Sequence, residues 1–173
     1  MIFILILKLK SIIKYSIMIK LGVTRFNIET YNQNKRWRES RYYDGCIYGS
    51  SVKIKESVSP HCVIIIFEMN NSLDIIEGIG IIKNTIVHKK YNIYNDNNYN
   101  RYIYKSNFRL DKKDFDESLR EIIINLEKLL FTGKTHLKRG HGIQIITDTL
   151  KKLNDFNFDK YFIDLFKTKL DNY

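Results

Sequence analysis

A continuous apolar run near the middle of the chain constrains the fold more than any other feature. Residues 62–69 read Cys-Val-Ile-Ile-Ile-Phe-Glu-Met, and apart from Glu68 they do not alternate between apolar and polar side chains. A strand with one face in water alternates, so an unbroken run predicts a strand that is buried on both faces. Turn residues at 70–74 and a second apolar stretch at 75–82 follow. The two stretches therefore predict an antiparallel hairpin.

Two glycines, Gly78 and Gly80, lie inside the second predicted strand. Glycine weakens a strand interior because it has no side chain to pack and loses much backbone entropy on folding. Where glycine is nevertheless found in a strand, it often marks a β-bulge or a point where another group comes close to the backbone. We therefore expect one of these features in the second strand.

In the second half of the chain the apolar spacing becomes helical. Apolar side chains recur at helical intervals from Phe115 onward, and Asp114 and Glu117 have the spacing of a capping box. Gly133 then provides a stop signal. This pattern predicts one long helix at about residues 114–131. Weaker patterns predict short strands at 86–94, 101–104, 108–110 and 143–146, and helical segments at 147–153 and 158–170.

The first 20 residues are apolar, but four lysines interrupt them. No uninterrupted apolar run approaches the ~20 residues that span a bilayer, and no small-residue cleavage site of a signal peptide is present. The segment fits a strand or helix packed on the domain, an interfacial amphipathic segment, or an extension upstream of a start at Met18. We favour the extension, because residues 18–26 have the pattern of an opening strand.

The sequence therefore predicts an N-terminal extension at residues 1–17 and a single α+β domain at residues 18–173. We expect a mixed, mostly antiparallel sheet or a small open β-barrel with flanking helices. The two cysteines, Cys46 and Cys62, are expected to be reduced thiols in a reducing compartment, although a disulfide between them stays open. These features predict an intracellular protein that is neither secreted nor an integral membrane protein.

The chain is strongly basic, with 29 Lys and Arg against 19 Asp and Glu and a formal net charge of +10. Such an excess favours a polyanionic partner, which can be DNA, RNA or an anionic membrane surface. An AT-rich genome would also raise the lysine content without any functional demand. The positions of the charges therefore matter more than their number, and two local clusters stand out.

The first cluster is a loop of basic residues between glycines, Gly133-Lys-Thr-His-Leu-Lys-Arg-Gly-His-Gly142, which we call the basic loop. Backbone N–H groups and cations converge in such loops, which suits the phosphates of nucleic acids. The alternative is a solvated loop without a ligand. Its first three residues resemble the end of a P-loop, but Lys128 stands where that motif needs glycine. His136 and His141 are five residues apart without a carboxylate, so neither a metal nor a cofactor is expected.

The second cluster combines aromatic rings with arginines on both sides of the predicted hairpin. Its aromatic and basic members are Trp37, Arg38, Arg41, Tyr42 and Tyr43 before the hairpin, and Tyr99, Arg101, Tyr102 and Tyr104 after it. Aromatic rings stack on bases at ~1–3 kcal/mol per base, while arginines neutralise phosphates. The alternative for each single ring is that it packs in the core.

No catalytic motif in the sequence is convincing. Asp44, Glu68 and Glu77 are conceivable as the acidic set of a nuclease, but no lysine follows them at the usual offset. We therefore expect a protein without catalytic activity and keep nuclease activity as a distant alternative.

The hairpin and the segment before it resemble the PUA-like superfamily, especially its EVE and YTH branches. The resemblance is carried by residues 60–69, by the Gly-Ile-Gly signature within residues 76–83, and by the aromatic and arginine-containing segment at 37–41. It covers residues 18–110. It implies a small, partly open β-barrel flanked by helices, with an aromatic pocket that binds a modified base or nucleic acid. The residues that match this pocket by position are Trp37, Arg38, Arg41 and Tyr42.

Residues 46–49, 68–71, 99–104 and 133–140 also look like those of a set of proteins from large DNA viruses with AT-rich genomes. This second resemblance implies a viral source, and a place in the host cytoplasm, the viral factory or the virion.

We expect a nucleic-acid-binding domain in which a groove lined by Trp37 and residues 99–104 stacks a base of DNA or RNA, while residues 134–139 hold phosphate. The alternative is a viral structural or assembly protein with a basic surface. The predicted contact residues are Trp37, Arg38, Arg41, Tyr42, Tyr99, Arg101, Tyr102, Lys134, His136, Lys138 and Arg139.

Overall fold

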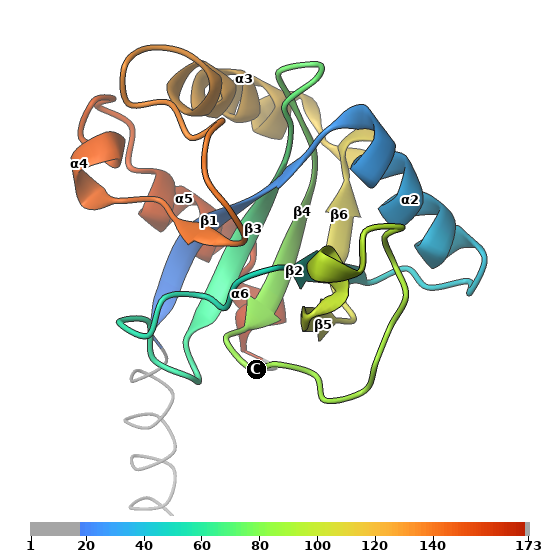
Figure 1. The fold of residues 1–173 in the computed structure, drawn as a ribbon. Helices are drawn as coiled ribbons and strands as arrows, with labels where there is room; N and C mark the ends of the chain where they lie inside the picture. Colours follow the sequence, from blue (N-terminus) through green and yellow to red (C-terminus); the bar gives the residue numbers. More distant parts are fainter. Residues whose placement is uncertain (1–17, 172–173) are drawn as a thin grey trace, which may run out of the picture.

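Figure 1 shows the fold in a computed structural model, which describes residues 18–171. The predicted extension at residues 1–17 lies outside the described residues. The strands are β1 (Ile19–Phe26), β2 (Cys46–Ser50), β3 (Val63–Asn70), β4 (Ile75–Lys83), β5 (Tyr102–Ser106), β6 (Arg109–Asp111) and β7 (Gln144–Ile145). The helices are α2 (Ile28–Glu39), α3 (Glu117–Phe131), α4 (Asp148–Lys151), α5 (Phe158–Leu165) and α6 (Lys167–Leu170), with short 3-10 helices η1 (Asn97–Asn100) and η2 (Lys112–Asp114). The α+β class predicted from the sequence is confirmed.

A five-stranded mixed sheet in the order β6-β4-β3-β1-β7 forms the centre of the fold, and β2 pairs with β5 in a separate two-stranded sheet. β3 and β4 form the predicted antiparallel hairpin, and the predicted opening strand is β1. β1 runs parallel to β3, whereas the other strand pairs are antiparallel. Among the described residues the strands do not close into a barrel.

The central strand β3 is covered on both faces, as its unbroken apolar run predicts. Side chains at odd-numbered positions, such as Phe67, pack in one core together with α3, α5 and α6. Those at even-numbered positions, such as Ile64, pack in a second core together with α2, β2 and β5. In Figure 1, α6 accordingly lies behind the sheet and β2 passes in front of it.

The two glycines of β4 lie where other side chains approach its backbone. A Cβ atom on Gly80 would lie 2.1 Å from Tyr48 Oη, and one on Gly78 would lie 2.6 Å from a guanidinium nitrogen of Arg109. The ladder between β4 and β3 also has an irregular register at residues 67–69 of β3. Both features that glycine suggested, a bulge in the pairing and a close approach, are therefore present.

Helix α2 has no counterpart among the predicted elements. Asn34 and Arg38 share its buried face with Trp37, so its apolar periodicity is weak. The signal that marks its start is local, because the side chains and backbone groups of Asn27 and Thr30 form a reciprocal capping box.

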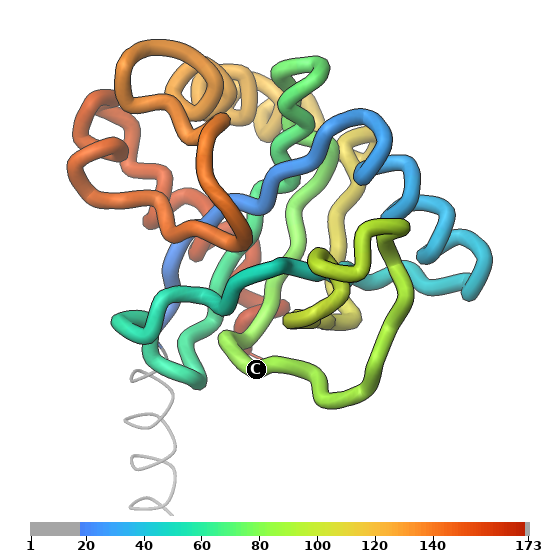
Figure 2. The backbone as a smooth tube through the Cα atoms, viewed as in Figure 1, coloured from blue at the N-terminus to red at the C-terminus, as the bar shows by residue number. Residues whose placement is uncertain are grey.

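Other boundaries also differ from the predicted ones. Helix α3 begins at Glu117 with Asp116 as its N-cap, after the 3-10 helix η2, so it covers most of the segment predicted at 114–131. The segment at 86–94 forms no strand but belongs to the wide loop that Figure 2 shows between β4 and β5. The segment at 158–170 is divided into α5 and α6 at Phe166.

Cys46 and Cys62 are both buried and free. None of the helices in the described part of the chain is long and apolar enough to cross a bilayer.

Candidate nucleic-acid interface

A cavity of 230 Å³ opens where the end of β1 meets the basic loop, and we call it the Tyr99 cavity. Its walls come from five segments that are far apart in sequence: the end of β1 with the turn into α2, the end of β2, Asn71 after β3, Tyr94 with Tyr99, and the basic loop. Among the described residues that line it none is Asp or Glu, and the basic ones are Arg25, Lys138 and His141. The fold thus brings two predicted contact residues, Tyr99 and Lys138, to one place.

Arg25 of β1 holds the basic loop against the sheet. Its Nη1 donates to the carbonyl of Leu137 and to Gln144 Oε1, and its Nη2 donates to the carbonyl of Gly142, each at 3.1 Å. No acidic side chain within residues 18–171 forms an ion pair with Arg25, and burial lowers its pKa. The basic loop is therefore fixed by hydrogen bonds, and an uncompensated guanidinium lies beneath it.

The charges of the basic loop do not all face the Tyr99 cavity. Lys138 lines the cavity, and its Nζ also lies 2.6 Å from Asp74 Oδ1. His136 is half-buried, and its Nδ1 accepts a hydrogen bond from the backbone N–H of Lys138 at 3.2 Å. Lys134 and Arg139 are exposed and lie outside the cavity lining. Of the four predicted contacts in this loop, Lys138 is the one that reaches the cavity.

Tyr94 and Tyr99 form the aromatic part of the cavity wall. Their rings pack edge to face, with centroids 6.1 Å apart. Tyr94 is buried, its Oη accepts a hydrogen bond from Asn34 Nδ2 at 3.1 Å, and burial raises its pKa to about 12. Tyr99 is 40% exposed. The cavity therefore presents one accessible ring, Tyr99, with a fixed neutral tyrosine behind it.

Asn71 stands in the cavity wall and carries a buried acceptor without a partner. Its Nδ2 donates to the carbonyl of Lys138 at 2.8 Å, whereas its Oδ1 is buried without a hydrogen-bond partner. The N-terminus of α2 also borders the cavity, but Asn27 and Thr30 already satisfy each other there. A ligand would consequently meet cations at the rim of the cavity, beside a helix end whose cap is already formed.

Trp37 does not reach the Tyr99 cavity, which corrects its predicted role as a stacking surface. It is 6% exposed and packs edge-on against Tyr43 and Tyr91, at centroid distances of 6.1 and 5.5 Å. The guanidinium of Arg41 covers the ring at 4.5 Å. Helix α2 turns the indole inward, so no face of Trp37 is open to a base.

The other predicted contacts do not share one groove. Arg38 and Tyr42 line a separate cavity at the C-terminal end of α2. The guanidinium of Arg101 lies 5.6 Å from the ring centroid of Tyr102, and neither residue lines the Tyr99 cavity. The contact residues predicted from the sequence therefore divide between the two ends of α2 and the surface near β5.

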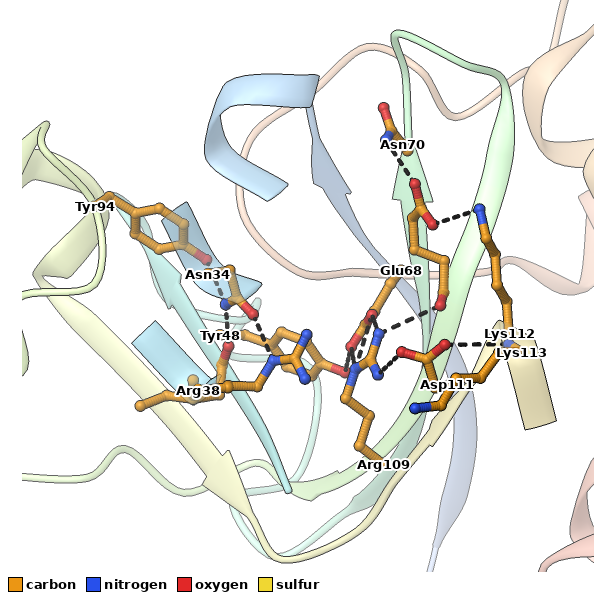
Figure 3. A network of polar contacts seen from close by, with 12 residues as sticks. Asn34, Arg38, Tyr48, Glu68, Asn70, Tyr94, Arg109, Asp111, Lys112 and Lys113 are labelled. Atoms are coloured by element: carbon orange, nitrogen blue, oxygen red, sulfur yellow. Dashed lines mark hydrogen bonds and ion pairs between the residues drawn. The ribbon is translucent and has the colours of Figure 1, made fainter. Parts of the chain in front are cut away.

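A buried network surrounds Glu68 on β3 (Figure 3). Arg109 donates from Nε and Nη2 to the Glu68 carboxylate, with a shortest distance of 2.7 Å, and Tyr48 Oη donates to Glu68 Oε1 at 2.9 Å. Arg109 Nη1 also bonds Asp111 Oδ2 at 2.7 Å. Burial would lower the pKa of Arg109, but the charge and hydrogen bonds of Glu68 outweigh burial and raise it. Glu68 therefore faces a permanent cation.

The second carboxylate of the conceivable nuclease set is also paired. Glu77 Oε2 lies 2.8 Å from Lys112 Nζ, and its Oε1 accepts from Asn70 Nδ2 at 2.8 Å. Asp44 is exposed and lines the cavity at the C-terminal end of α2. Within the described residues, no three His, Cys, Asp or Glu side chains gather as a metal-binding group. Glu68 and Glu77 thus form ion pairs with Arg109 and Lys112. The arrangement of these carboxylates gives the nuclease alternative no support.

Comparison of the chain with family models, curated proteins and solved structures finds no match. The resemblances to the PUA-like superfamily and to the viral protein set therefore stay expectations from the sequence. The function has to be inferred from the side chains of the cavity.

Proposed function

We propose that this chain is a nucleic-acid-binding domain that takes one base into the Tyr99 cavity. The observation that supports this most is the convergence of an accessible ring and basic side chains on one cavity, with no acidic residue among its described lining. A polyanion would avoid an acidic wall, whereas it gains from a basic one.

Each part of the cavity has a counterpart in a nucleotide. Tyr99 provides a flat surface on which a base stacks. Lys138 and His141 line the same cavity and would contact the phosphates beside that base. A volume of 230 Å³ is smaller than the ~300–1,000 Å³ of drug-sized pockets, so a single base fits better than a stack of bases.

The test is binding of fluorescein-labelled single-stranded and double-stranded DNA and RNA oligonucleotides, with and without methylated bases, measured by fluorescence anisotropy at several salt concentrations. We expect Tyr99→Ala to weaken binding of the preferred oligonucleotide by ~1–3 kcal/mol, or about 5- to 150-fold in affinity, with little change in the salt dependence of binding. Tighter binding of a methylated oligonucleotide would identify the modified-base reader that the PUA-like resemblance implies.

Lys134→Gln is the matched control, because Lys134 lies on the same loop, is exposed and does not line the cavity. It should reduce the salt slope slightly and leave the ranking of oligonucleotides unchanged. If Tyr99→Ala weakens every oligonucleotide no more than Lys134→Gln does, the basic surface only condenses nucleic acid. That result would favour the structural or assembly protein instead.

A further inference from the structure

Arg38 presents unused hydrogen-bond donors to the cavity at the C-terminal end of α2. Arg38 is only 8% exposed, and its Nε donates to Asn34 Oδ1 at 3.1 Å. Within residues 18–171, neither its Nη1 nor its Nη2 has a hydrogen bond or an ion pair. The guanidinium lines a cavity of 560 Å³, which we call the Arg38 cavity. Neither Nη atom is among the buried atoms without a partner in the described residues, so both are open to the cavity and available to an anion.

Asn34 fixes the orientation of this guanidinium. Its Nδ2 donates to the carbonyl of Ile47 at 2.7 Å and to Tyr94 Oη at 3.1 Å, which leaves Oδ1 facing Arg38 (Figure 3). Tyr94 and Ile47 are themselves buried in the second core. The Nη1 and Nη2 edge of the Arg38 guanidinium is therefore held in place before any ligand arrives. A bidentate contact with this edge would cost little conformational entropy.

The other charged side chains around the Arg38 cavity are acidic in slight excess. Apart from Arg38, three basic and four acidic side chains line it: Lys35, Arg109, Lys113, Glu39, Asp44, Asp111 and Asp114. Arg109 is committed to Glu68 and Asp111, and Lys35 Nζ lies 3.9 Å from Glu39 Oε1. An array of several phosphates would meet the acidic side chains, whereas one small oxyanion can bind the free edge of Arg38 alone.

Tyr42 at the rim of the Arg38 cavity adds a second unusual feature. Its backbone has φ 49°, in the left-handed region that a bulky residue rarely adopts, and its side chain is 96% exposed. Backbone strain of this kind gathers at ligand sites and is held there by the surrounding structure. The turn that imposes it is closed by hydrogen bonds from the N–H groups of Tyr42 and Tyr43 to the carbonyls of Glu39 and Arg38.

We propose that the Arg38 cavity binds one phosphate group through a bidentate contact with Nη1 and Nη2 of Arg38. Arginine suits such a contact because its planar fork matches two oxygens of the anion. The acidic side chains around the cavity favour the phosphate of a small nucleotide, and one phosphodiester of a nucleic acid is the other outcome of the test. This site does not depend on base insertion into the Tyr99 cavity, because the two cavities share no lining residue.

The experiment measures the melting temperature of the full chain in sodium phosphate, sodium sulfate and sodium chloride at equal ionic strength. We expect phosphate and sulfate to raise it by a few degrees above chloride, because an anion that binds only the folded state stabilises it. Arg38→Gln should abolish the difference from chloride. Arg36→Gln, which removes the same charge from an exposed position of the same helix, should keep it.

Side-chain NMR of the arginines in the unmodified protein tests the site without any substitution, in case Arg38→Gln does not fold. Titration with inorganic phosphate should shift the Arg38 guanidinium signals and leave those of Arg36 unchanged. Separate titrations with a mononucleotide and with an oligonucleotide then distinguish the two sources, because the one that belongs to the site shifts the Arg38 signals at a lower concentration than inorganic phosphate does. The proposal is overturned if phosphate shifts no Arg38 signal, or if Arg38→Gln keeps the rise in melting temperature. Tyr99→Ala should leave both readouts unchanged, so failure here is distinct from failure of base binding.

Discussion

Aromatic residues with similar sequence neighbours have opposite environments in this protein. Trp37 and Tyr99 both lie near arginines, yet the indole is sealed between Tyr43 and Tyr91 while the Tyr99 ring borders a cavity. The difference comes from the backbone that carries them. Trp37 lies on the inward side of a helix, whereas Tyr99 lies on a short 3-10 helix in a surface loop.

The thiols give a prediction at the residue scale. Burial raises the pKa of Cys46 to about 12 and also raises the pKa of Cys62, and the thiolate is the reactive form. We expect both cysteines to resist iodoacetamide in the native protein from pH 7 to pH 9, with both alkylated once urea unfolds the chain. Mass spectrometry after timed alkylation measures this. Rapid native modification of Cys46 would show that its site opens.

At the scale of single elements, α2 carries both candidate sites. Its first turn borders the Tyr99 cavity and its last turn borders the Arg38 cavity. Polar residues on its buried face connect the two ends, since Asn34 bonds both Tyr94 and Arg38. The apolar periodicity of α2 is weak because polar side chains on its buried face form hydrogen bonds there. The sequence pattern therefore did not predict this helix.

The basic loop offers a prediction at the same scale. Arg25→Met keeps the length of the side chain but removes three hydrogen bonds to the loop and to β7. We expect amides of residues 137–145 to exchange with deuterium faster, and the free energy of unfolding to fall by about 1.5–3 kcal/mol.

Arg139→Met is the control for Arg25→Met, because it removes an exposed arginine from the same loop. Its exchange pattern should match that of the unmodified protein. Equal exchange in both variants would mean that Arg25 does not fix the loop.

At the scale of the whole molecule, β3 separates two apolar cores, and Glu68 puts a charge into the second of them. Arg109 reaches that charge from the edge strand β6, across the space that Gly78 leaves open. An ion pair buried this way is costly to break, because the remaining charge has no water around it.

A double-mutant cycle tests this arrangement. Arg109→Met should lower the free energy of unfolding in urea by ~3–5 kcal/mol, since it leaves Glu68 buried without a cation. Adding Glu68→Gln should restore a large part of that loss, because the amide is neutral and can still accept from Tyr48. Simple additivity of the two substitutions would show that the pair contributes little to stability.

The sequence by itself determined the elements whose signal is local. The hairpin of β3 and β4 follows from consecutive apolar residues, and β1 follows from apolar residues at alternate positions, Ile19, Leu21 and Val23. The glycines of β4 predicted a close approach to its backbone, which Tyr48 and Arg109 make. Where a helix buries polar groups, as α2 does, the periodicity faded and the prediction failed.

Only the tertiary structure decided which charged and aromatic residues meet. Tyr99 and Lys138 share a cavity because β1, β2 and the basic loop converge there, with Arg25 and Asn71 as members that no local pattern singles out. Trp37 was excluded because burial depends on what packs across a helix. A sequence shows which side chains can bind an anion or a base. Residues more than 100 positions apart, such as Arg25 and Leu137, come into contact only when the strands pair.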